Sequence, residues 1–161
     1  MKRFILVSSS IIILFLFISF LFLYSIWAEK NTIEKQMIDK VKDRLPMINQ
    51  IEQVDYYAGE KAYYVMFAKD RFGDPLFIWT NEEELRYRYL NHYLTKEQIK
   101  KLVSHSEKNL TVKRITTGII DQERLIYEVL YEDQGGRLGY LYYDLQNGGF
   151  IKKYRLGVTT S

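Results

Sequence analysis

The sequence lacks cysteine altogether and contains only two histidines. Without cysteine the chain has no disulfide scaffold, no thiolate metal site, no cysteine nucleophile and no lipid-modified cysteine. The two histidines, His92 and His105, are separated by a spacing that fits no common metal motif. Neither a phosphate-binding glycine loop nor a serine motif of the acyl-transfer enzymes occurs. The sequence therefore predicts no catalytic, metal-binding or cofactor-binding residue, and an enzyme is the class of protein that it supports least.

Charge is missing from one long stretch and is nearly balanced elsewhere. Residues 4–28 contain no Lys, Arg, Asp or Glu. The 133 residues from 29 to 161 carry 21 of the 23 basic side chains and all 20 acidic ones, about one net positive charge. Because affinity for nucleic acid comes mainly from neutralising phosphates, this balance argues against a nucleic-acid partner.

The uncharged stretch at residues 4–28 predicts a membrane anchor. As a helix, 25 residues span roughly 38 Å, more than the ~30 Å hydrocarbon core requires. Tyr24 and Trp27 lie near its end, where interfacial aromatic residues are common. A cleaved signal peptide is the alternative, with Ala28 before the cut, but Ile26 is bulky where cleavage prefers a small residue.

The basic residues before the stretch set the expected orientation. Lys2 and Arg3 favour a cytoplasmic N-terminus, and long domains are translocated largely regardless of their charge. We therefore expect residues 1–28 to form a cytoplasmic tip and a single transmembrane anchor, with the C-terminal domain on the outer side of the cell membrane.

A helix is predicted for residues 29–45, directly after the anchor. Asn31 and Glu34 fit a capping box at its start, and Pro46 ends the pattern. An apolar stripe recurs every four residues at Ile33, Met37, Val41 and Leu45. The pattern indicates a packing helix; the alternative is a membrane-proximal basic helix that contacts anionic lipid.

Strand-like segments rich in Tyr, Val, Phe and Ile follow this helix. The first group comprises residues 50–58, 61–69 and 76–80. The run of glutamates from Glu82 predicts a helical linker over residues 82–94. A further helix begins at Thr95, with Gln98 three residues later as a second capping pair. The last group of strands is predicted at 110–119, 124–132, 138–145 and 149–155.

The order of one helix and then several strands occurs twice, at a shift of 63 residues. At this shift Asp70 aligns with Asp133 and Gly73 with Gly136, both in turns. Three aromatic pairs also align: Tyr64 with Tyr127, Phe77 with Tyr140, and Trp79 with Tyr142. We therefore predict an α+β fold in which two modules, residues 29–81 and 95–161, each have a helix packed on an antiparallel sheet, and the two share one core.

Tyrosine is abundant, with 13 of the chain's 14 tyrosines lying outside the anchor. Most of them suit sheets with one wet face, where the ring packs and the hydroxyl stays hydrated. Tyrosine, tryptophan and arginine are also enriched at binding hot spots. The linker and the strand before it therefore hold the predicted partner-binding residues: Trp79, Arg86, Tyr87, Arg88, Tyr89 and Tyr93.

The sequence resembles the YpmB-like, or TseB-like, cell wall elongation regulators of Gram-positive bacteria. The resemblance covers nearly the whole chain and is carried by residues 59–65, 75–79, 95–98, 127–129 and 142–144 with Gly148. It implies two tandem PepSY-like modules of cystatin-like fold behind a single membrane span. No functional residue is carried over from the family.

The resemblance also implies a function. It indicates a non-enzymatic regulator of cell wall elongation that acts through a penicillin-binding protein, with no cofactor and no small-molecule substrate. A modulator of an extracytoplasmic peptidase, acting through the loops at 71–75 and 133–137, is the first alternative. A module that binds wall glycan through Tyr and Trp faces is the second.

Overall fold

The computed structural model describes the backbone of residues 2–121 and 123–157, and the side chains of those from residue 12 onward. The chain divides into two compact units, one ending at Asp43 and the other beginning at Arg44.

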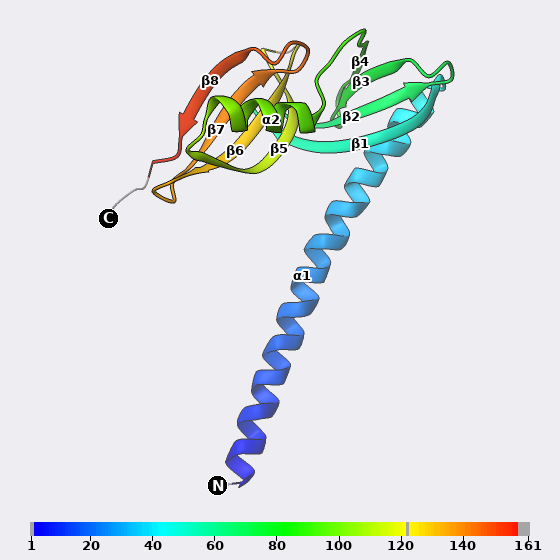
Figure 1. The fold of residues 1–161 in the computed structure, drawn as a ribbon. Coiled ribbons are helices and arrows are strands. Elements are labelled where there is room, and N and C mark those ends of the chain that lie inside the picture. Colours follow the sequence, from blue (N-terminus) through cyan, green and yellow to red (C-terminus); the bar gives the residue numbers. More distant parts are fainter. Residues whose placement is uncertain (1, 122, 158–161) are drawn as a thin grey trace. The chain divides into compact units, whose positions relative to one another are not determined.

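The N-terminal unit is a helix, α1, which spans Lys2–Arg44 (Figure 1). From Ile12 onward this helix is long and apolar enough to cross a membrane, and none of its most apolar stretch is buried in protein. The expected transmembrane helix is confirmed to this extent.

The predicted helix start at Asn31 is wrong, because α1 runs through this segment without interruption. No glycine or proline lies between Ala28 and Pro46, so nothing in the backbone stops the helix. The Thr32 hydroxyl donates to the carbonyl of Ala28 at 2.8 Å, a bond that forms inside helices.

The second unit contains two four-stranded antiparallel sheets and one helix (Figure 1). In both sheets the strands pair in chain order, so each sheet is a meander. The first sheet consists of β1 (Ile48–Ala58), β2 (Ala62–Asp70), β3 (Pro75–Thr80) and β4 (Leu85–Tyr89). The second consists of β5 (Leu110–Ile120), β6 (Arg124–Asp133), β7 (Leu138–Asp144) and β8 (Phe150–Arg155).

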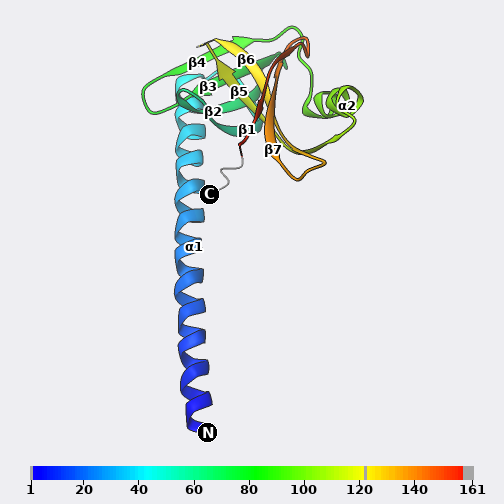
Figure 2. The ribbon, with the colours of Figure 1, turned by 90° about the vertical axis from the view of Figure 1, so that its left-hand side faces the viewer.

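The helix α2 (Lys96–Ser106) connects the two sheets, and the views in Figures 1 and 2 place it on one face of the second sheet. Its predicted capping box is confirmed. The Thr95 hydroxyl accepts from the backbone N–H of Gln98 at 3.3 Å, and the Gln98 side chain accepts from the Thr95 backbone N–H at 2.7 Å. Ile99 and Val103 form its buried face.

The predicted helical linker over residues 82–94 is wrong, because its centre forms strand β4. The Asn81 side-chain oxygen accepts from the backbone N–H groups of Glu83 and Glu84 at 3.0 and 2.9 Å, which turns the chain back along β3. The alternating Arg and Tyr residues then pair with the apolar strand β3 as its antiparallel neighbour. The run of glutamates therefore occupies a turn, and β4 belongs to the first sheet.

The turns between the second and third strands of the two sheets are equivalent, as the shift of 63 residues predicts. Asp70 Oδ1 accepts from two backbone N–H groups of its turn at 2.8 and 2.9 Å. Asp133 Oδ1 does the same in the second sheet at 2.9 and 3.0 Å. Gly73 and Gly136 adopt φ values of 89° and 75°, which only glycine takes without steric cost.

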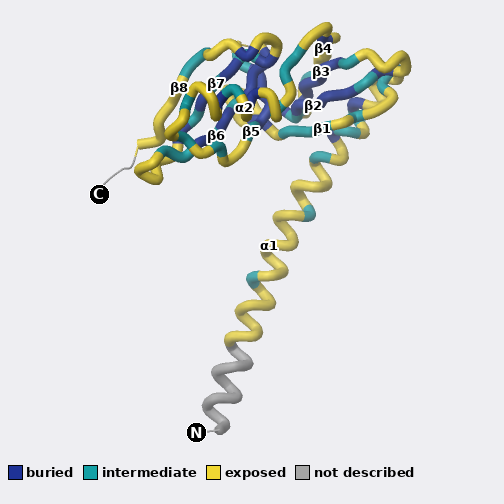
Figure 3. The backbone as a smooth tube through the Cα atoms, viewed as in Figure 1, coloured by how far each residue is buried: buried dark blue, intermediate teal, exposed yellow. Residues whose placement is uncertain are grey.

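A single hydrophobic core is shared by both sheets and α2. It includes Val65 and Phe77 from the first sheet, Ile126 and Leu141 from the second, and Ile99 from the helix. Figure 3 shows these buried segments on strands of both sheets. The expectation that the two sheet-forming segments share one core is confirmed.

Candidate functional site

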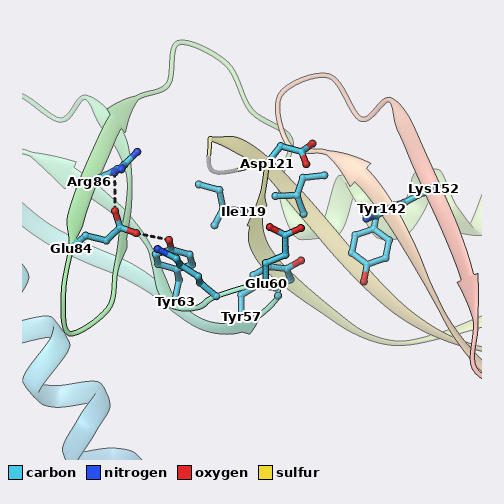
Figure 4. Close-up of a pocket in the computed structure, with 12 residues that line it drawn as sticks. Tyr57, Glu60, Tyr63, Glu84, Arg86, Ile119, Asp121, Tyr142 and Lys152 are labelled. Carbon is cyan, nitrogen blue, oxygen red and sulfur yellow. Dashed lines mark hydrogen bonds and ion pairs between the residues drawn. The ribbon is translucent and has the colours of Figure 1, made fainter.

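A cleft of about 330 Å³ lies between the two sheets, beside the turns that join β1 to β2 and β5 to β6 (Figure 4). The first sheet and its turns contribute Tyr57, Gly59, Glu60, Lys61, Tyr63, Glu84 and Arg86. The second contributes Ile119, Ile120, Asp121, Tyr142 and Lys152. The lining therefore holds three acidic and three basic side chains among several tyrosines.

One wall of the cleft is a chain of three linked side chains from β2, the β3–β4 turn and β4. The Tyr63 hydroxyl donates to Glu84 Oε1 at 2.5 Å, and Arg86 Nε lies 3.0 Å from Glu84 Oε2. The hydrogen bond to Glu84 raises the pKa of Tyr63 to about 12, and the same bond lowers the pKa of Glu84 below its usual value. Glu84 is thus a fixed anion, and Tyr63 a fixed donor, at physiological pH.

Tyr57 lies at the base of the cleft and is 4% exposed. Two glycines leave space for its ring, because a Cβ on Gly59 or Gly118 would lie 2.6 or 2.5 Å from a ring atom of Tyr57. Burial raises the pKa of Tyr57 to about 12. The phenol is therefore a neutral group whose position is set by both sheets.

The opposite wall is formed by Tyr142 of β7 and Lys152 of β8. The Tyr142 hydroxyl donates to Glu128 Oε2 at 2.8 Å; burial and then this bond raise the pKa of Tyr142. The Lys152 ammonium lies over the rings of Tyr142 and Tyr154, 4.9 and 5.1 Å from their centroids. These contacts hold a cation at this wall by interaction with aromatic faces.

The arrangement is suited to recognition by hydrogen bonds and ion pairs. The carboxylates accept, the lysines and the arginine donate, and the fixed phenols orient their neighbours. In the parts of the chain that the structure describes, no three His, Asp or Glu side chains cluster as metal ligands would.

The structure separates the residues predicted to bind a partner. Trp79 is only 3% exposed and belongs to the core. The Tyr93 ring packs on Phe67 with centroids 5.2 Å apart, and Tyr93 is half-buried. Arg86 alone among the predicted residues lines the cleft.

The remaining three predicted residues lie on β4. The Arg88 guanidinium lies 6.0 Å from the centroid of the Trp79 ring and pairs with Glu123 at 3.5 Å. Tyr87 and Tyr89 are each 45% exposed, and their rings meet edge to face at 6.2 Å. Of the predicted aromatic residues, Tyr87 and Tyr89 are thus accessible to a partner at the surface, whereas Trp79 is not.

Sequence reasoning missed most of the cleft, including Tyr57, Tyr63, Glu84 and Lys152. A signal was present in the repeat, because Tyr142 occupies the position equivalent to Trp79 in the alignment at 63 residues. That alignment does not tell which strands of the two sheets face each other, so it could not locate the cleft.

Taken together, the described residues define a class of protein with one helix able to span a membrane and a unit of two antiparallel meanders that share a core. No protein-family model and no curated protein matches the chain. Among solved structures, the YpmB protein from Bacillus subtilis is similar, with a TM-score of 0.59 and 19% sequence identity. The match covers 71% of this chain and 91% of the YpmB chain. A YpmB-like fold is thereby confirmed.

Proposed function

We propose that this chain is a membrane-anchored, extracytoplasmic binding protein that regulates cell wall elongation through a penicillin-binding protein or another wall-synthesis protein. The YpmB-like fold, the helix able to span a membrane and the resemblance of the sequence support this proposal. In it, residues 29–81 together with strand β4, and residues 95–161, are two PepSY-like modules of cystatin-like fold, and residues 1–28 are the cytoplasmic tip and anchor.

The free edge of β4 is the observation that carries the proposal. Among the described residues, β4 is the last strand of the first sheet and pairs only with β3. A backbone hydrogen bond lies at each end of this strand pair: the Asn81 N–H donates to the Glu84 carbonyl at 3.0 Å, and the Leu90 N–H donates to the Pro75 carbonyl at 3.1 Å. These two bonds determine which residues of β4 turn their backbone groups toward β3. In an antiparallel pair every second residue turns its N–H and C=O toward the partner strand.

This alternation determines which groups of β4 a partner meets. The backbone groups of Arg86 and Arg88 point toward β3, whereas those of Leu85, Tyr87 and Tyr89 point away from the sheet. An extended segment of another protein can therefore add to β4 as a fifth strand. The side chains beside it are arginine and tyrosine, two residue types enriched at binding hot spots.

The membrane anchor makes a modest interface sufficient. A partner held in the same membrane meets β4 at an effective concentration far above its average concentration in the cell. The proposal therefore predicts that function needs a membrane span but not this span's particular sequence. Exchange of residues 1–28 for an unrelated span is expected to preserve function, and secretion of the outer part without a span to abolish it.

In-cell photo-crosslinking of the tagged full-length chain tests the proposal. A benzophenone amino acid at Tyr89 is expected to capture a membrane-bound wall-synthesis enzyme, identified by mass spectrometry. The same probe at Tyr154, which is 51% exposed on edge strand β8, is the matched control and is expected to capture none. Equal capture from both positions, or capture from neither, would overturn the role of β4.

A proline substitution tests the mode of binding. Tyr87→Pro removes an N–H that points away from the sheet, and proline is tolerated at such positions of edge strands. Capture through the probe at Tyr89 is expected to disappear in this variant and to persist in Tyr87→Phe, which keeps the backbone donor. Thermal unfolding of both variants establishes that the sheet itself is intact.

One observation favours the second candidate function, modulation of an extracytoplasmic peptidase. Phe72, in the loop at 71–75, is 91% exposed, and such a side chain is suited to insertion into a cleft. If this function holds, crosslinking recovers a peptidase, and Phe72→Ala releases it while Phe150→Ala does not. Phe150 is a suitable control because it is also exposed, at 57%.

A further inference from the structure

The cleft between the sheets contains charges of both signs that are not neutralised within it. Among the residues that the structure describes, no ion pair or hydrogen bond engages the carboxylates of Glu60 and Asp121. The Lys152 ammonium lies over tyrosine rings rather than on a carboxylate. In Figure 4 the carboxylates of Glu60 and Asp121 lie between Arg86 on one side and Lys152 on the other.

We propose that this cleft binds a short zwitterionic peptide, with the peptide's ammonium at Glu60 and Asp121 and its carboxylate at Lys152. The side chain of Arg86 brings β4 into the lining of the cleft, but the proposal rests neither on strand addition at the edge of β4 nor on the proposed function. A volume of about 330 Å³ is at the small end of the range for ligand pockets, which favours a peptide of a few residues over a folded partner.

The charge balance of the lining argues for a ligand that carries both signs. Three carboxylates and three cations line the cleft, so it has no net attraction for a polyanion. Glu84 is already engaged by both Tyr63 and Arg86. Of the cations, Arg86 pairs with Glu84, and the charge of Lys61 also acts on Glu84 and helps to lower its pKa. The two carboxylates that remain available therefore select an ammonium group, and Lys152 selects an anion.

The tyrosines of the cleft do not offer the open faces on which a sugar ring would stack. Tyr57 and Tyr63 are 4% and 9% exposed. The face of Tyr142 carries the Lys152 ammonium at 4.9 Å from its centroid. The tyrosines instead shape the walls, and the charged groups provide the recognition.

The walls are ordered before any ligand arrives. Tyr63 and Arg86 hold Glu84, Glu128 holds the hydroxyl of Tyr142, and Gly59 and Gly118 leave the space that the Tyr57 ring fills. A rigid site loses little side-chain entropy on binding, so a small peptide gains more from each ion pair.

Titration followed by NMR tests the proposal on the isotope-labelled full-length chain in detergent micelles. The probes are alanine peptides of two to four residues, whose charged ends lie about 7 to 14 Å apart when extended. One of them is expected to shift the resonances of Tyr57, Asp121 and Lys152. Acetylation of its N-terminus, or amidation of its C-terminus, is expected to weaken binding at least tenfold.

Variants then identify the groups that bind each end. Asp121→Asn and Lys152→Gln are each expected to weaken binding of the uncapped peptide about tenfold. Arg88→Gln is the matched control, because Arg88 is half-buried and ion-paired but does not line the cleft, and it is expected to bind normally. The asparagine suits the φ of 51° at Asp121, so this variant keeps the turn.

Three outcomes would overturn the proposal. The first is equal binding of capped and uncapped peptides, which would show that the end charges are not recognised. The second is an equal shift of the same resonances by inorganic phosphate or by an N-acetylglucosamine trimer, which would identify an anion or glycan site. The third is an unchanged affinity in both Asp121→Asn and Lys152→Gln.

Discussion

Replacing Asp55 by alanine tests the polar link between the two sheets. Asp55 lies on β1, and its Oδ2 accepts from the backbone N–H of Thr117 on β5 at 3.1 Å and from Gln53 Nε2 at 2.7 Å. Its Oδ1 accepts from Lys96 Nζ, at the start of α2, at 2.8 Å. A single carboxylate thus joins the first sheet to the second sheet and to the helix between them.

The expected cost follows from what the substitution leaves without a partner. Thr117 is fully buried, so its N–H loses a charged acceptor without gaining water, at a cost of about 1–3 kcal/mol. The partly exposed ion pair with Lys96 adds about 0.2–1 kcal/mol. The Asp55→Ala variant is therefore expected to lose about 1–4 kcal/mol of unfolding free energy, a fall in Tm of about 4–16 °C at roughly 4 °C per kcal/mol.

Two measurements on the full-length chain in detergent micelles check this estimate. Thermal unfolding, followed by near-ultraviolet circular dichroism, gives the fall in Tm. Hydrogen exchange at the Thr117 amide, by NMR, reports on the bond itself and is expected to accelerate in Asp55→Ala. Lys96→Met is the matched control, because it removes the ion pair but leaves the acceptor of Thr117 in place, and is expected to cost less than about 1 kcal/mol.

The reasoning would be refuted in either of two ways. A loss below about 1 kcal/mol in Asp55→Ala would mean that the buried N–H finds another partner. A loss in Lys96→Met as large as that in Asp55→Ala would mean that the ion pair, and not the buried amide, dominates.

Three further predictions concern local features of the fold. Thr95→Ala removes the capping box of α2 and is expected to cost about 1 kcal/mol in chemical denaturation. Gly118→Ala places a Cβ 2.5 Å from the ring of Tyr57, so the ring must move, and the expected loss is about 1–3 kcal/mol. The pKa of Tyr63, about 12 in the folded chain, exceeds the value near 10 of an unfolded tyrosine. The bond to Glu84 therefore stabilises the fold fully below about pH 10, and this stabilisation is lost as pH rises through 12. In Tyr63→Phe the free energy of unfolding is expected to fall less steeply with pH over this range.

Each of these predictions has a control in the same chain. Gly157→Ala is expected to change nothing, because a Cβ there meets no atom within 4 Å, and a loss equal to that of Gly118→Ala would contradict the steric argument. Ser104→Ala, within α2, is expected to be neutral or slightly stabilising; an equal loss in Thr95→Ala and Ser104→Ala would contradict the capping argument. Tyr154→Phe, which removes the hydroxyl of an exposed tyrosine, is the matched variant, and the Tyr63 argument fails if both variants change the alkaline profile of stability alike.

Where the sequence predicted local structure correctly, the information lay within a few neighbouring residues. The turns at Asp70 and Asp133 are specified by a carboxylate and a glycine three residues later. The start of α2 is specified by Thr95 and Gln98. Strand positions followed from runs of aromatic and β-branched residues, and their ends matched the structure within about two residues.

The two errors in secondary structure arose where tertiary contacts or continuity decide the outcome. A run of glutamates at 82–84 suits the start of a helix. The residues that follow the run instead pair with β3 and form strand β4. Asn31 and Glu34 fit a capping box, but no residue before Asn31 ends the preceding helix. The helix α1 therefore continues through this segment. The intrinsic propensity of a segment determines which secondary structures it can adopt, and its contacts with neighbouring helices and strands determine which of these it forms.

The sequence by itself determined the apolar segment long enough to span a membrane, the strands, the capped helix and the equivalent turns. Each of these depends on hydrophobicity, periodicity or hydrogen bonds within a short stretch of chain. Only the tertiary structure decided that Trp79 is buried, that β4 is a free edge, and that charges of both signs line one cleft. Those features depend on which faces of the two sheets meet, and that choice is made by contacts between residues about sixty positions apart, such as Asp55 and Thr117.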